Sequence, residues 1–205
     1  MEIRDLNISD VPKIAEVHEK SFRDFFLTSL GRDFLEVYYS SCINNDKTIG
    51  IGLFDNEGNL HGFATGTIQS LGYHKTLLLQ NTFLFFKSLL FVSLSRPKVI
   101  FRLAKNINKK SNRLDDKQYA ELLSIAILPN LKGSGYGKVL LEEFEKKVKS
   151  HSATKIALTT DYNNNDSVIK FYNKCGYEVY YDFITYPNRH MYKLIKNLNK
   201  NETNN

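Results

Sequence analysis

The stretch PNLKGSGYGKVLLEEFEKKVKS, residues 129–150, places three glycines within five residues and continues directly into an amphipathic pattern. Leu141, Phe144 and Val148 recur at helical spacing, so the glycines come just before a helix that begins near Tyr136. The first N–H groups of a helix have no internal partners, and glycines let the backbone approach a ligand closely. The stretch therefore predicts an anion site, in particular one for a phosphate. A tight strand-to-helix turn without a ligand is the alternative.

Strand and helix patterns alternate along the chain and predict an α/β (α+β) fold with a mixed sheet covered by helices. The expected elements are a strand at 2–7, a helix capped by Ser9 or Asp10, a helix at 30–43, a hairpin at 48–69 that turns at 55–58, a largely helical insertion at about 73–114, a strand at 119–128, the helix from Tyr136, a strand at 155–162, a helix at 166–176 closed by Gly176, and strands at 177–184 and 190–196. We expect one domain over residues 1–198 and a disordered polar tail at 199–205.

Charge and cysteine usage limit the class of protein only broadly. Lys and Arg number 28 against 22 Asp and Glu, and the net charge of +6 attracts anions without choosing among them. Cys42 and Cys175 have no metal-ligand spacing, so we expect no metal site, no disulfide framework and a reduced, cytoplasmic setting. The charged start does not resemble a signal peptide. The apolar stretch 76–94 contains Gln80, Asn81 and Lys87, which favours a buried or interfacial helix over a membrane span.

Two familiar phosphate loops fit the glycine stretch badly. A Walker A loop needs Ser or Thr after its Gly-Lys pair, but Val139 follows Gly137 and Lys138. The dinucleotide fingerprint needs GxGxxG early in a βαβ unit, whereas this pattern is GxGxG and comes late in the chain.

A third interpretation fits both this stretch and a second one. SIAILPNLKGSGYGKVLL resembles the pyrophosphate-loop signature Q/R-x-x-G-x-G/A of the GNAT acetyltransferase superfamily, and NNDSVIKFYNKCGY resembles its second signature, N-x-x-A-I-x-x-Y-x-x-x-G-F. The matching residues are Lys132, Gly133, Ser134, Gly135, Tyr136 and Gly137, then Asn165, Val168, Ile169, Tyr172, Gly176 and Tyr177. Lys132 replaces Gln or Arg but keeps a positive donor. The resemblance covers residues 117–180 strongly, the first 70 residues loosely by element order, and the insertion hardly at all.

The resemblance implies a GNAT-like, mostly antiparallel central sheet and acetyl-CoA as the acetyl donor. Backbone groups of Ile125, Ala126 and Ile127 would pair with the pantetheine arm as an added strand would. Amides from Gly133 to Lys138, which include those of Ser134, Gly135, Tyr136 and Gly137, would hold the pyrophosphate beside Lys132. Asn165 would hydrogen-bond the cofactor. Tyr172, two helical turns or about 10 Å further on, would protonate the departing thiolate.

The general base is less well determined by this resemblance. Ribosomal-protein-acetylating relatives carry a Glu where this chain has Thr160, whereas Glu121 matches the Glu of histone-acetylating relatives. Glu121 lies six strand residues before Ile127, about 20 Å, which is comparable with an extended pantetheine arm. Asp161, a water relay, or Glu121 as an ordinary surface charge are the alternatives.

The resemblance implies a primary amine of a small molecule or peptide as the acceptor, but the sequence does not name it. An amino sugar attached to a nucleotide would suit aromatic side chains beside arginines. The candidates are Phe22, Phe25, Phe26, Tyr38 and Tyr39 with Arg23 and Arg32, whose alternative role is helix packing. The basic insertion suggests a second hypothesis, a CoA-binding module with weak or no catalysis, docked on an anionic membrane or a partner. No recognition motif supports nucleic-acid binding. We expect a monomer or homodimer.

Overall fold

One sheet of seven strands, in the order β1-β2-β3-β4-β5-β7-β6, runs through the computed structural model of the protein. The structure describes residues 1–95, 98, 101, 105 and 115–199. The strands are β1 (Glu2–Asp5), β2 (Thr48–Phe54), β3 (Leu60–Thr67), β4 (Ala120–Ile127), β5 (Lys155–Asp161), β6 (Glu178–Thr185) and β7 (Arg189–Asn197). Neighbours are antiparallel except β4 and β5, which are parallel. The mixed, mostly antiparallel sheet that was predicted is confirmed.

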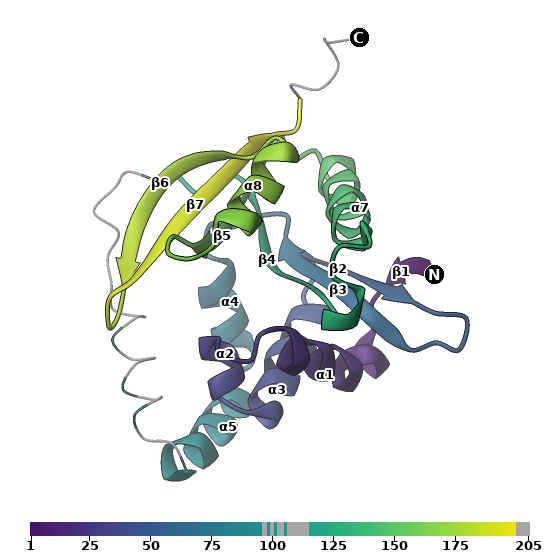
Figure 1. Ribbon diagram of the computed structural model, residues 1–205. Coiled ribbons are helices and arrows are strands. Elements are labelled where there is room, and N and C mark those ends of the chain that lie inside the picture. Colours follow the sequence, from purple (N-terminus) through teal and green to yellow (C-terminus); the bar gives the residue numbers. More distant parts are fainter. Residues whose placement is uncertain (96–97, 99–100, 102–104, 106–114, 200–205) are drawn as a thin grey trace.

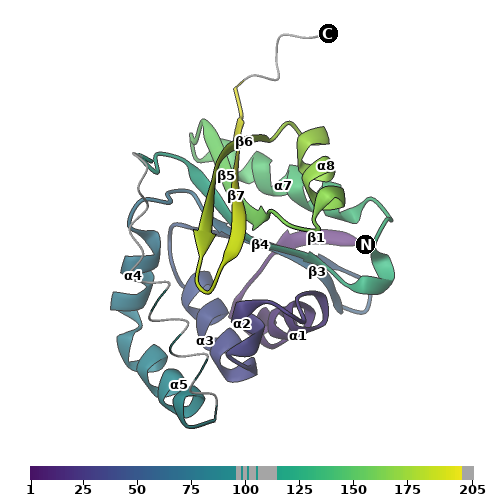
Figure 2. The same ribbon diagram turned by 60° about the vertical axis from the view of Figure 1, so that its left-hand side comes forward.

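Helices cover both faces of this sheet (Figure 1). The helices before the hairpin, which lie on one face, are α1 (Val11–Ser21), α2 (Phe26–Ser29) and α3 (Arg32–Ile43). On the other face lie α7 (Tyr136–Ser150) and α8 (Asp166–Lys174), as Figure 2 also shows. Two short 3-10 helices, Ile8–Asp10 and Pro129–Leu131, precede α1 and α7. The sheet is thus the middle of three layers, and any site at its strand ends lies between two helical layers.

The amphipathic spacing read from the sequence explains how α7 sits on the sheet. Leu141, Phe144 and Val148 are fully buried, and they join a core cluster with Ile51 of β2 and Leu158 of β5. A second cluster on the opposite face packs α1 and α3 against β2, β3 and β4. The two clusters hold the central strands from both sides.

The insertion after β3 packs on α3 and, through Tyr73, also contacts the sheet at Thr48 of β2. It begins with α4 (Tyr73–Gln80) and α5 (Thr82–Ser95). Leu77 of α4 packs in a buried cluster with Cys42 of α3. Phe85 of α5 packs in another buried cluster with Phe34 of α3. Its described part is helical, as predicted. The rest of the predicted insertion, apart from Lys98, Phe101 and Lys105, lies outside the described residues, as does the predicted tail after Asn199. No helix in the described ranges is long and apolar enough to cross a membrane.

Asp10 is the N-cap residue of the first helix, as predicted, but it makes no side-chain capping bond to that helix. Neither Ser9 nor Asp10 caps α1 with its side chain; instead, Asn7 and Asp10 form a capping box around the preceding 3-10 helix. The Asp10 carboxylate accepts the Asn7 N–H at 3.0 Å and two bonds from Arg4 at 2.8 Å. Both carboxylate oxygens of Asp10 are therefore hydrogen-bonded to residues that precede α1. Helix α3 begins at Arg32 rather than residue 30, because Gly31 has a φ of +91°.

Candidate active site

Strands β4 and β5 separate over half of their length. They pair only near their starts, the last paired positions being Leu122 and Leu158. A bulge lies at Leu123, because the register with β3 passes from Leu122 opposite Gly66 to Ser124 opposite Thr65. A bulge bends its strand and increases the twist. The end of β4 thus turns away from β5, and within the described residues no strand pairs with its free edge.

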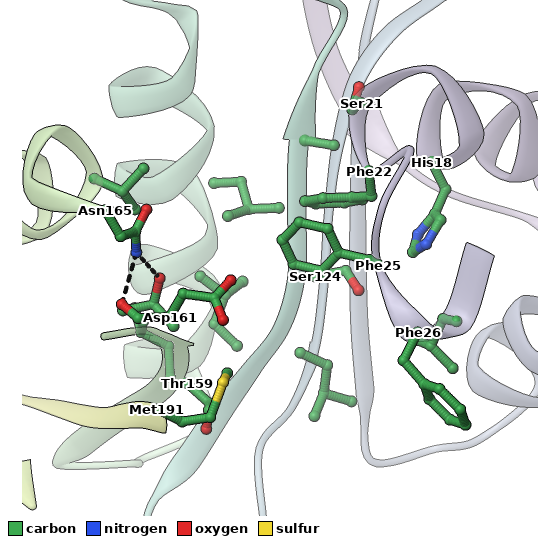
Figure 3. A pocket seen from close by; sticks show the side chains of 18 of the residues that line it. His18, Ser21, Phe22, Phe25, Phe26, Ser124, Thr159, Asp161, Asn165 and Met191 are labelled. Atoms are coloured by element: carbon green, nitrogen blue, oxygen red, sulfur yellow. Dashed lines mark hydrogen bonds between the residues drawn. The ribbon is translucent and has the colours of Figure 1, made fainter. Parts of the chain in front are cut away.

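A cavity of about 550 Å³ occupies this opening. Figure 3 shows its two walls, with β4 and the helices α1 and α2 on one side and β5 with Asn165 on the other. The lining residues are His18, Ser21, Phe22, Phe25, Phe26, Leu27, residues 122–127, Lys132, residues 158–161, Asn163, Asn164, Asn165, Val168, Tyr172, Arg189 and Met191. Of the predicted cofactor-binding residues, Ile125, Ala126, Ile127, Lys132, Asn165 and Tyr172 are therefore brought together here.

The glycine stretch forms the turn between β4 and α7. Gly133 and Gly135 have φ values of +83° and +86°, which side chains disfavour, and Gly135 is the N-cap of α7. Among the described residues, the amides of Gly133, Gly135, Tyr136 and Gly137 donate to no backbone carbonyl. The first turn of α7 carries no acidic residue. Free amides at a helix N-terminus are suited to bind an anion.

The side chains of this turn are largely exposed. Lys132, Ser134 and Lys138 face solvent, and Tyr136 is half-buried against the core cluster below α7. The Ser134 hydroxyl donates to the Leu131 carbonyl at 2.5 Å, which leaves the backbone amides as the main donors that the turn presents.

Tyr172 and Asn165 approach the cavity from the same helix. Asn165 is the N-cap of α8, and its side-chain amide donates to Thr160 Oγ1 at 2.8 Å and to the Asp161 carbonyl at 2.9 Å. These bonds join the end of β5 to the start of α8. Tyr172 is 7% exposed, and burial raises the pKa of its phenol well above the ordinary value. Its hydroxyl is therefore a proton donor rather than an anion at neutral pH. The predicted closure of α8 by Gly176 is present, with a φ of +86°.

Glu121 lies at the closed end of the opening, where β4 still pairs with β5. Its side chain is outside the set that lines the cavity. One carboxylate oxygen contacts the Lys193 ammonium, and the other accepts the Ser70 hydroxyl at 2.5 Å. Burial acts to raise the pKa of Glu121, but the charge of Lys193 and these two hydrogen bonds outweigh it and lower the pKa. Glu121 is thus an ionised, buried and paired carboxylate.

The predicted acceptor residues separate into two groups. Phe22, Phe25 and Phe26 line the cavity, whereas Tyr39 is fully buried in the core. Arg23 and Arg32 are not in the lining, so the cavity lends no support to the predicted arginines of this segment. The guanidinium of Arg32 instead donates to Glu36 at 3.0 Å along the surface of α3.

Two lining residues that carry charge or basicity, Arg189 and His18, were not among the predicted site residues. Arg189 lies at the start of β7, where it pairs with Asp161, and its guanidinium carbon is 4.9 Å from the ring centroid of Phe25. His18 lies on the buried face of α1. No local pattern points to Arg189, because its partners come from distant segments. For His18, the apolar spacing of α1 gave a signal that its side chain is turned inward.

An open strand edge that leads to a helix N-terminus suits an extended ligand that carries phosphates. The fold and the cavity therefore define an α/β protein with a cavity suited to such a conjugate. Residues 92–177 match the model of the acetyltransferase (GNAT) family. This part of the chain thus matches a GNAT acetyltransferase domain, the family that the two signatures indicated.

Solved structures of N-acetyltransferases share the fold over nearly the whole chain. The ribosomal-protein-S18-alanine N-acetyltransferase of Escherichia coli is 13% identical with a TM-score of 0.61, covering 96% of this chain and 93% of that one. PaiA N-acetyltransferase of Thermoplasma acidophilum in complex with coenzyme A is 19% identical with a TM-score of 0.56, covering 96% of this chain and 98% of that one. Spermidine N-acetyltransferase of Vibrio cholerae is 15% identical with a TM-score of 0.61, covering 97% of this chain and 95% of that one. No curated protein sequence matches the chain significantly.

Proposed function

We propose that this protein transfers the acetyl group of acetyl-CoA to a primary amine of a small molecule or peptide. The observation that carries the proposal is the cavity between β4 and β5, which is lined by Tyr172 and by Lys132, the residue directly before the glycine turn. The family match supports the acyl transfer. The similar structures include a spermidine N-acetyltransferase and a ribosomal-protein-S18-alanine N-acetyltransferase, which supports an amine as the acceptor class.

The donor's binding residues follow from the free groups of the site. The edge of β4 at Ile125, Ala126 and Ile127 would pair with the pantetheine arm, because this edge has no strand partner among the described residues. Of the predicted amides from Gly133 to Lys138, those of Gly133, Gly135, Tyr136 and Gly137 would bind the pyrophosphate, because the amides of Ser134 and Lys138 already donate to backbone carbonyls. Lys132 would add a positive charge beside it. Asn165 would contribute its side-chain carbonyl, because its amide hydrogens are already used within the protein.

The acetyl thioester supplies an activated acyl group, and this chain's residues supply the proton transfers. Tyr172 would donate its proton to the departing sulfur, a role that a buried and protonated phenol can fill. We propose direct attack by the amine rather than an acyl-enzyme. Cys42 is fully buried with its pKa raised to about 11 by burial, and Cys175 is not in the cavity lining.

The assignment of Glu121 as general base stays a prediction. Its carboxylate is ionised, as a base must be, but it lies at the closed end of the opening and is held by Lys193 and Ser70. A base can also act through one intervening water. The variant Glu121→Gln, alone and combined with Lys193→Met, tests this assignment.

The acceptor pocket would lie on the α1 side of the cavity, where Phe22 and Phe25 face the pair of Arg189 and Asp161. Aromatic rings beside a guanidinium are consistent with the predicted amino sugar attached to a nucleotide. This finer assignment stays a prediction. It would be abandoned if spermidine or lysine peptides were acetylated and no nucleotide-linked amino sugar was.

The test is a CoA-release screen against polyamines, amino acids, aminoglycosides, peptides and nucleotide-linked amino sugars, together with calorimetric titration of CoA. We expect CoA binding and turnover of at least one amine. The matched variant Tyr172→Phe should keep CoA binding and lose about 10²-fold or more in kcat. Absence of CoA binding at millimolar titrant would refute the proposal.

The docking hypothesis has one structural observation in its favour. Leu79, Phe83 and Phe86 of α4 and α5 are 66%, 76% and 64% exposed. Exposed apolar side chains on neighbouring helices can mark an interaction surface. Flotation with vesicles of anionic lipid tests it, and recovery of all protein in the bottom fraction would remove the membrane version.

A further inference from the structure

His18 brings a nitrogen base to the cavity from α1. It is 2% exposed, and its ring lies with its centroid 4.8 Å from that of Phe22. Figure 3 shows the side chain extending from α1 on the same side of the cavity as Phe22 and Phe26. It is the histidine found among the lining residues.

The two hydrogen bonds of the Tyr39 hydroxyl bear on which nitrogen of His18 carries the proton. Nδ1 lies 2.7 Å from the Tyr39 hydroxyl, and that hydroxyl donates to Ser124 Oγ at 3.3 Å. A phenol has one proton to donate. When Tyr39 donates this proton to Ser124, Nδ1 is the donor to Tyr39, and in this tautomer Nε2 keeps a lone pair.

Nε2 has no hydrogen-bond partner among the described residues, although it is buried. An unsatisfied buried polar atom costs free energy, and native proteins keep few of them. Burial also lowers the pKa of His18 to about 4, so the ring is neutral at pH 7 and Nε2 can accept a hydrogen bond. A ligand group that carries N–H would satisfy this atom.

We propose that His18 Nε2 accepts the N–H of the acceptor amine and takes up its proton during acetyl transfer. The inference rests on the proposed function and names a catalytic residue for it. Ser124 supports the location, because it follows the bulge at Leu123 where the opening begins. Tyr39 is then a positioning residue, since its hydroxyl holds the tautomer through Nδ1.

The proton balance of this step is complete. The amine nitrogen forms a bond to the acetyl carbon, the carbon–sulfur bond breaks, one amine proton goes to His18 Nε2 and the sulfur receives the proton of Tyr172. Exchange with water then returns both residues to their starting forms. A weak base is sufficient, because the nitrogen becomes strongly acidic once its lone pair is bonded to carbon. A neutral imidazole also favours the neutral, nucleophilic amine over the ammonium.

The surroundings of His18 are consistent with this role. Tyr39 is hydrogen-bonded to His18, and Ser124 is hydrogen-bonded to Tyr39. The charged groups that line the same cavity are Lys132, Asp161 and Arg189. Asp161 and Arg189 neutralise each other as an ion pair. Nε2 is shielded from bulk water, so the amine must displace a neighbouring side chain, and Phe22 is the half-buried neighbour that faces the cavity.

Nitrogen NMR of protein labelled in its histidines tests the proposal without any variant. We expect His18 at neutral pH to show a protonated Nδ1 and an unprotonated Nε2. Adding benzylamine to the CoA-loaded protein, with occupancy followed at the Met191 methyl group, should shift the Nε2 resonance. A protonated Nε2, or an Nε2 resonance that does not move as the Met191 signal saturates, would overturn the proposal.

Kinetics with benzylamine supply the second test. His18→Phe should lower kcat about 10²-fold while the affinity for CoA stays unchanged. His151→Phe, which removes an exposed imidazole that does not line this cavity, is the matched control and should keep kcat. Tyr39→Phe should lower kcat less and increase the protonated-Nε2 form in the NMR spectrum. If the wild type binds no CoA, the proposed function fails; if it acetylates benzylamine and His18→Phe keeps its kcat, only this inference fails.

Discussion

Arg189 donates to both carboxylate oxygens of Asp161, with Nε–Oδ1 and Nη2–Oδ2 distances of 2.5 and 2.6 Å. The pair joins the first residue of β7 to the last residue of β5. The guanidinium carbon also lies 4.9 Å from the ring centroid of Phe25, on the opposite wall of the cavity. One arginine thus neutralises the carboxylate on the β5 wall and contacts the aromatic wall.

Removal of this arginine should change which amines the protein prefers. In Arg189→Met, the Asp161 carboxylate faces the cavity without its partner and attracts cations more strongly. We expect kcat/KM for spermidine relative to benzylamine to rise about tenfold. The double variant Arg189→Met with Asp161→Asn should lose this gain. An unchanged ratio in the single variant would show that the pair does not face the acceptor.

The glycine turn should bind CoA through its backbone shape. In Gly135→Ala, the added methyl group meets no atom within 4 Å, so its effect comes from the φ of +86° and not from a clash. A residue with a side chain costs about 1–2 kcal/mol in this conformation. We expect the Kd for CoA, measured by calorimetry, to rise about tenfold.

Gly58 supplies the matched control for this prediction. It has a φ of +78° and equally free space, but lies in the turn between β2 and β3. Gly58→Ala should destabilise the fold by a similar free energy in urea and leave CoA affinity unchanged. Equal effects of the two variants on CoA affinity would contradict a specific role of the glycine turn.

The ion pair of Glu121 and Lys193 should stabilise the fold strongly. The two side chains are 13% and 7% exposed, so removing one charge leaves the other buried and unpaired. We expect Glu121→Gln to lower the free energy of unfolding by about 3–5 kcal/mol. The double variant with Lys193→Met should recover most of this loss, as urea unfolding would measure.

The same variants test Glu121 as the general base. If it is the base, the double variant stays inactive although its stability is recovered. If the double variant recovers its kcat together with its stability, Glu121 acts only through the fold.

His18 should make stability depend on pH in a defined window. Its folded pKa of about 4 lies below that of an unfolded histidine, about 6.5, so the unfolded chain binds the proton more tightly. The free energy of unfolding therefore falls as the pH drops from about 6.5 to about 4, by up to about 3 kcal/mol. His18→Phe should lose this slope in urea unfolding at a series of pH values. A slope equal to that of the wild type would mean that His18 is not responsible.

Local patterns in the sequence determined the elements that hold the glycine turn, Asn165 and Tyr172. The turn and the start of α7 depend on glycines and apolar spacing within a few residues. The end of α8 is equally local, since the amide of Tyr177 donates to the carbonyl of Tyr172 at 3.0 Å across Gly176. Such signals need no distant partner, so they could be read along the chain.

Tertiary structure alone decided how wide the site opens and what faces it. The separation of β4 from β5 follows from the bulge at Leu123, which exists only relative to β3. His18 and Arg189 reach the same cavity from segments more than a hundred residues apart in the sequence. The surroundings of these residues, which set their charge and partners, are made by contacts between distant segments, and no short stretch of sequence encodes them.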